Sequence, residues 1–65
     1  MLVTNKLSNN LYEAKDESRS IFFWLNTDNS WTVNLRDQNR RAMLIEDSFD
    51  DAQGVAYKYL EVFPA

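Results

Sequence analysis

Residues 21–36, which read IFFWLNTDNSWTVNLR, decide the fold of this protein. Residues 21–25 are apolar at every position and rich in strand-forming types, whereas residues 31–36 alternate between apolar and polar side chains. Residues 27–30 between them are turn-forming types, so the segment predicts two strands joined by a short turn. In the second strand, Trp31, Val33 and Leu35 point to one side of the sheet, and Thr32, Asn34 and Arg36 point to the other.

A third strand and a helix follow. Residues 37–40 form a second polar turn, and residues 41–45 read as a strand. Apolar residues then recur at the helical period, which predicts one amphipathic helix with a continuous apolar stripe. The stripe consists of Ala52, Val55, Ala56, Tyr59, Leu60 and Phe63. Ser48 or Asp50 can cap its start, and Gly54 is expected to let a strand approach the helix closely.

These elements predict one α+β domain over residues 1–65, with a three-stranded antiparallel sheet covered on one face by a C-terminal helix. Residues 1–20 are harder to interpret. The alternation in Leu11–Lys15 allows an extra N-terminal strand, and a short helix beginning at Ser8 is the competing interpretation. The residues expected beneath the helix are Phe23, Leu25, Trp31, Val33, Leu35, Ala42 and Leu44.

Composition narrows the function classes. The 65 residues include no cysteine and no histidine, so disulfides, thiolate ligands and the commonest general base are absent. We therefore expect a non-enzymatic protein without cofactor or metal. The acidic corner at Glu46, Asp47, Asp50 and Asp51 lacks the spacing of a calcium loop and suits the positive end of the helix dipole.

Size, charge and hydropathy constrain the partners. A chain this short has a small core, which makes self-association or a stable complex an expected source of further burial. The net charge of −3 disfavours nucleic acid as a partner. The longest apolar run, residues 21–25, is far too short to cross a membrane, and the first residues lack the pattern of a secretory signal. The cysteine-free composition favours a cytoplasmic location.

The sheet side opposite the helix is the candidate site. One helix covers one face, so the other face lies open unless residues 1–20 fold over it. Its aromatic and aliphatic residues are typical of a protein-binding surface. The predicted binding residues are Phe22, Trp24, Thr32, Asn34, Arg36, Met43 and Ile45.

Part of the pattern resembles a known family. The run Trp31-x-Val33-x-Leu35-Arg36-Asp37 is followed by Phe49 and by a helix containing Val55-Ala56. This resembles the AP2/ERF DNA-binding domain over roughly residues 21–63, and the strand-strand-strand-helix order is similar to the arm-binding domains of tyrosine integrases. The resemblance implies a sheet face that lies in the DNA major groove.

Two hypotheses therefore stand. The resemblance implies DNA contacts from Asn34, Arg36, Arg40 and Arg41, with Arg19 nearby in the basic cluster. A groove-reading face depends on hydrogen-bond donors and positive charge. Because the face carries Phe22, Trp24, Met43 and Ile45, the sequence favours a protein-binding module, regulatory or inhibitory, or a homo-oligomer subunit.

Overall fold

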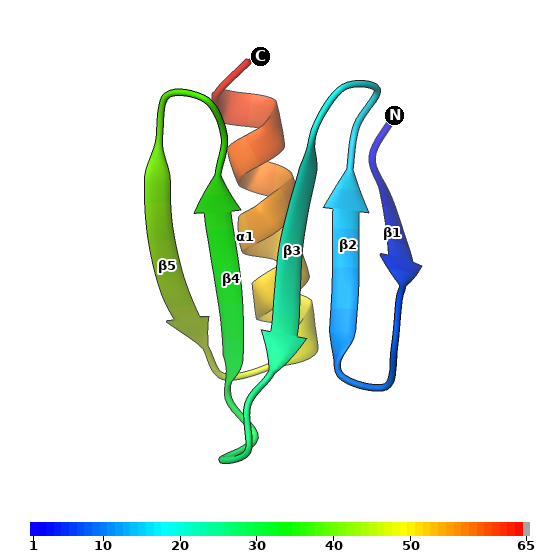
Figure 1. Ribbon diagram of the computed structural model, residues 1–65, viewed down its shortest axis with the longest axis vertical. Coiled ribbons are helices and arrows are strands. Elements are labelled where there is room, and N and C mark those ends of the chain that lie inside the picture. The colour runs from blue at the N-terminus through cyan, green and yellow to red at the C-terminus, as the bar shows by residue number, and fades with distance from the viewer. Residues whose placement is uncertain (65) are drawn as a thin grey trace.

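A computed structural model describes residues 1–64 as a five-stranded antiparallel sheet with one helix packed across one face (Figure 1). The strands lie side by side in chain order, so each pairs with the next one along the chain. The elements are β1 (Val3–Lys6), β2 (Leu11–Lys15), β3 (Ser20–Leu25), β4 (Trp31–Arg36), β5 (Arg41–Glu46) and α1 (Phe49–Val62). The predicted α+β class and the three predicted strands are confirmed. The predicted three-stranded sheet is wrong, because the sheet has five strands.

The two additional strands come from the N-terminal segment. Strand β2 pairs antiparallel with β3, with Ala14 opposite Ile21, and β1 then pairs with β2, with Thr4 opposite Ala14. The possible strand at Leu11–Lys15 is thus confirmed, and the competing helix from Ser8 is wrong. The free edge of β3 explains this arrangement, because its backbone N–H and C=O groups need partners and a neighbouring strand supplies them.

Aspartates shape the turns of this glycine-poor chain. Asp16 Oδ1 accepts hydrogen bonds of 2.8 Å from the backbone N–H groups of Ser18 and Arg19. Asp37 Oδ1 does the same between β4 and β5, at 2.8 and 3.0 Å. In the turn after β3, Asn29 adopts a left-handed φ of 70°, which asparagine tolerates better than most residues. The predicted turns at residues 27–30 and 37–40 are therefore confirmed.

The helix begins as predicted. Ser48 is the N-cap, and its hydroxyl accepts a 3.1 Å hydrogen bond from the backbone N–H of Asp51. Asp50 and Asp51 occupy the first turn, where negative charge complements the helix dipole. The expected role of Gly54 is wrong: a Cβ built there would meet nothing within 4 Å, because this residue lies on the exposed side of the helix.

The core lies between α1 and the sheet. Ile21, Phe23 and Val33 are fully buried, each contributing about 1.5–3 kcal/mol of hydrophobic stabilisation. Ala52 and Ala56 face them from the helix and keep the two layers close. An aromatic cluster with ring centroids 4.9 to 6.1 Å apart extends this core, and its members are Tyr12, Phe23, Trp31 and Phe49.

The helix does not extend over the whole sheet. Ala42 and Leu44 of β5 were expected beneath it, but both are exposed, Leu44 by 40%. Strand β5 forms one edge of the sheet, and a single helix crosses the middle strands (Figure 1). The expectation was correct for Phe23, Val33 and Leu35, which lie on central strands.

Candidate functional site

The sheet side away from α1, here called the open face, carries every residue of the predicted protein-binding set. Strand pairing places Phe22 opposite Asn34, and Asn34 opposite Met43. It also places Trp24 opposite Thr32, and Thr32 opposite Ile45. Opposed residues of antiparallel strands point to the same side, and the alternate residues Ile21, Phe23 and Val33 are buried under the helix. The predicted set therefore lies on one surface.

Residues 1–20 do not cover this face, because they continue the sheet sideways as β1 and β2 (Figure 1). Among the described residues, no second layer packs on this side. Met43 is 61% exposed, Ile45 62% and Phe22 37%. Trp24 is half-buried and lies between Leu11 and Thr32. The open face thus presents exposed apolar side chains from β3 and β5 to solvent, with the polar Asn34 of β4 between Phe22 and Met43.

Thr32 differs from its neighbours on the open face. It is only 8% exposed, and its hydroxyl is hydrogen-bonded to the side chain of Asn26, with Oγ1 2.9 Å from Nδ2 and 3.1 Å from Oδ1. Asn26 Nδ2 also donates to Ser30 Oγ at 3.0 Å. Thr32 therefore anchors the turn between β3 and β4, and the exposed groups around it are the ones a partner can reach.

Strand β2 adds residues that the sequence analysis missed. Leu11, Glu13 and Lys15 extend the open face beyond β3. The Glu13 carboxylate accepts hydrogen bonds from Ser20 Oγ at 2.6 Å and Asn5 Nδ2 at 3.3 Å. The bond from Ser20 is the largest cause of the lowered pKa of Glu13. The alternation in Leu11–Lys15 was the signal that could have revealed these residues.

The charges on the open face are segregated. Lys15 is paired with Ser20, and Arg36 with Arg41, so all three cations lie at the end of the sheet where β2 and β4 finish and β5 starts (Figure 1). A cleft of about 350 Å³ borders this end, lined by Ser18, Arg19, Ser20, Arg36, Asp37, Gln38, Asn39 and Pro64. The acidic corner lies at the opposite end, where α1 begins. One end of the sheet is therefore basic although the net charge of the chain is −3.

Two arginines of the expected basic cluster, Arg19 and Arg40, make contacts inside the fold. The Arg40 guanidinium lies over the Phe63 ring, 4.4 Å from its centroid, on the helix side of the sheet. The predicted grouping of Arg40 with Asn34, Arg36 and Arg41 is therefore wrong for Arg40, because stacking on an aromatic ring holds it away from the open face.

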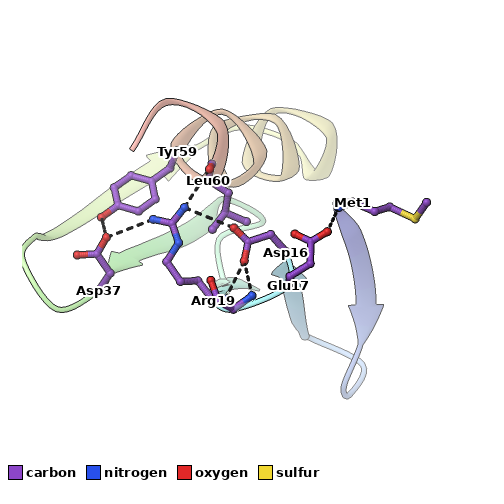
Figure 2. A network of polar contacts seen from close by, with 8 residues as sticks. Met1, Asp16, Glu17, Arg19, Asp37, Tyr59 and Leu60 are labelled. Carbon is purple, nitrogen blue, oxygen red and sulfur yellow. Dashed lines mark hydrogen bonds and ion pairs between the residues drawn. The ribbon is translucent and has the colours of Figure 1, made fainter. Parts of the chain in front are cut away.

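Arg19 lies in a network on the helix side (Figure 2). Its side chain is almost buried, and Nη2 donates to the backbone oxygen of Leu60 at 3.0 Å. It also pairs with Asp16 at 3.4 Å and with Asp37 at 3.5 Å. Tyr59 donates its hydroxyl proton to Asp37 Oδ2 at 2.7 Å, which is the main cause of the lowered pKa of Asp37. Arg19 thus ties two turns to the end of the helix.

The described residues show neither a metal centre nor a membrane span. Within residues 1–64, no group of three or more acidic side chains converges as metal ligands would, the acidic corner included. The one helix described is not long and apolar enough to cross a membrane.

Comparison of the chain with protein-family models, curated proteins and solved structures finds no match.

Proposed function

We propose that this chain is a small, non-enzymatic protein-binding module, regulatory or inhibitory, that docks its open face against a partner protein in the cytoplasm. The supporting observation is that no described segment covers the side of the sheet away from α1. Residues 1–20 extend the sheet sideways and leave the apolar side chains of this side exposed. Exposed apolar side chains gathered on one face of a domain mark an interaction surface.

The composition of the face favours a protein partner. Phe22, Met43 and Ile45 are exposed apolar anchors, and the half-buried Trp24 adds an aromatic surface beside Phe22 on β3. Aromatic residues dominate the energetics of protein interfaces, with charged residues at the rim. Arg36 and Arg41 lie at one end of the face, in the position of such a rim. The absence of histidine and cysteine supports a non-enzymatic role, because the usual bases and nucleophiles are missing.

The test replaces anchors without touching the core. Phe22→Ser combined with Ile45→Ser removes two apolar groups from the open face, whereas Leu7→Ser removes an exposed apolar group from the turn between β1 and β2. We expect partners crosslinked to the wild type in its native host to be lost with the double variant and kept with Leu7→Ser. Partners that bind the double variant as strongly as the wild type would refute the proposal.

A nucleic-acid-binding function of the AP2-like type is the second candidate, and the clustered cations favour it. Lys15, Arg36 and Arg41 lie at one end of a face that also carries Phe22 and Trp24, and phosphate contacts beside aromatic rings are typical of nucleic-acid surfaces. Phosphate contacts strengthen as salt is lowered. Duplex binding is therefore measured at low and moderate salt, and no binding at low salt excludes this candidate.

Matched arginine variants sharpen that measurement. Arg36→Gln with Arg41→Gln removes two open-face cations, and Arg40→Gln removes one cation from the helix side. Binding through the open face predicts that the affinity of the double variant depends less on salt than that of the wild type. The salt dependence of Arg40→Gln should stay closer to that of the wild type.

A further inference from the structure

The two edges of the sheet differ in how well they are protected against pairing. Edge strand β1 is four residues long and contains Asn5 and Lys6, and short, lysine-bearing strands discourage pairing with another chain. Edge strand β5 is six residues long, with the apolar run Ala42, Met43, Leu44 and Ile45 at its centre. No described residue lies beyond β5 (Figure 1), so its outward backbone N–H and C=O groups are free to pair.

We propose that two copies of this chain pair through β5, antiparallel, and form one continuous sheet across a two-fold axis. Charge identifies the second copy as the occupant. Strand β5 begins at Arg41, directly after Arg40, and ends at Glu46, directly before Asp47. Antiparallel pairing with itself brings opposite charges together at both ends, and like charges opposite each other would oppose a parallel pairing.

The alternation of side chains between the two sides of the sheet limits the register of the β5–β5 pairing. Opposed residues must point to the same side of the sheet, which excludes any slip by a single residue. Met43 paired with Met43 of the second copy places Ala42 opposite Leu44 and Arg40 opposite Glu46. Shifting by two residues, so that Leu44 meets its own copy, places Met43 opposite Ile45, Ala42 opposite Glu46 and Arg41 opposite Asp47. The second register therefore matches charges and apolar groups better, because the first places Arg41 opposite Ile45 and depends on Arg40, which stacks on Phe63.

The exposed apolar groups near this edge also support the pairing. On the helix side, Leu44 is 40% and Val62 54% exposed. Val62 lines an apolar groove between α1 and β4, together with Leu35, Val55, Lys58, Tyr59 and Phe63. A two-fold axis perpendicular to the sheet places both helices on the same side, so each copy covers part of the other's edge. Pairing β5 with β1 instead would be head-to-tail and open-ended, and the polar β1 opposes it.

A charge swap tests the proposal by sedimentation equilibrium over a range of concentrations. Arg41→Glu and Asp47→Arg each place two like-charged pairs across the axis, and we expect each to weaken dimerisation about tenfold. The double variant restores opposite charges, and we expect it to dimerise as the wild type does. A wild type that remains monomeric at all concentrations, or a dimer that neither single variant weakens, would overturn the proposal.

A cysteine probe locates the contact, because the natural chain has no cysteine. With Met43→Cys, a short thiol-specific crosslinker should join two copies in high yield. Leu7→Cys, on an exposed turn away from β5, should not give this product. Equal yields from both variants, or an uncrosslinked dimer of Met43→Cys, would contradict pairing at β5. Phe22→Ser should leave the dimer intact, so failure of this proposal is distinguishable from failure of docking through the open face.

Discussion

The covered and open faces of strand β3 carry similar side chains with different environments. Ile21 and Phe23 are fully buried beneath α1, whereas Phe22 is exposed and Trp24 half-buried on the other side. The four residues are adjacent in sequence and all apolar. The difference arises because the described fold has one helix and one sheet, which gives each strand one covered side. In this protein, apolar character alone does not identify the core.

The largest expected effect is the loss of stability when the side of β3 beneath the helix is disrupted. Phe23→Ala should cost about 3–5 kcal/mol, because it removes a fully buried ring and leaves a cavity. A core of this size rarely supplies more than about 3–5 kcal/mol, so we expect the variant to be unfolded at 25 °C. Phe22→Ala should cost about 1 kcal/mol or less. Denaturant unfolding measures both, and similar losses at the two positions would contradict the comparison.

A second prediction compares a buried arginine with an exposed one. Arg19→Met should cost about 3 kcal/mol, because it leaves the carboxylates of Asp16 and Asp37 without their shared cation. Arg36→Met, on the open face, should change stability by no more than about 0.5 kcal/mol. Thermal unfolding of the two variants checks the difference. An Arg19→Met protein as stable as the wild type would show that the network in Figure 2 contributes little to the fold.

The helix cap provides an intermediate effect. Ser48→Ala removes the hydroxyl that accepts a hydrogen bond from the Asp51 backbone, and we expect a loss of about 1 kcal/mol. Ser48→Asp retains an acceptor at the same position and should recover most of that loss. The free energy of unfolding from urea titrations measures both changes. Equal instability of the two variants would mean that the hydroxyl does not act as a cap.

The smallest expected effect concerns acid pH. Hydrogen bonding lowers the pKa of Asp37 below its ordinary value of 3.8 in the folded chain. Its stabilisation is therefore present above the unfolded pKa and is lost as the pH falls through the folded pKa. Tyr59→Phe removes the hydroxyl that causes most of this shift. We expect the melting temperature of the variant to fall less than that of the wild type between pH 5 and pH 3, as monitored by tryptophan fluorescence; an unchanged slope would contradict this prediction.

Several features of the site could be predicted from sequence because they are local. Alternation in Trp31–Arg36 correctly separated Val33 and Leu35 from Asn34 and Arg36. The same reasoning could not show that Thr32 would be buried, because this depends on Asn26 reaching back across the turn. It also could not distinguish Arg40 from Arg41, since stacking on Phe63 requires the end of the helix to lie beside the turn.

The sequence by itself determined the identity of the helix and of three strands, two candidates for the helix cap and the residues that turn the chain. These follow from side-chain periodicity and from backbone preferences over a few neighbouring residues. Only the tertiary structure decided that residues 1–20 widen the sheet instead of covering it, and therefore that one face and the β5 edge remain exposed. The physical reason is that a strand pattern specifies which side chains share a face, whereas the choice between pairing at an edge and packing on a face depends on backbone groups far away in the chain.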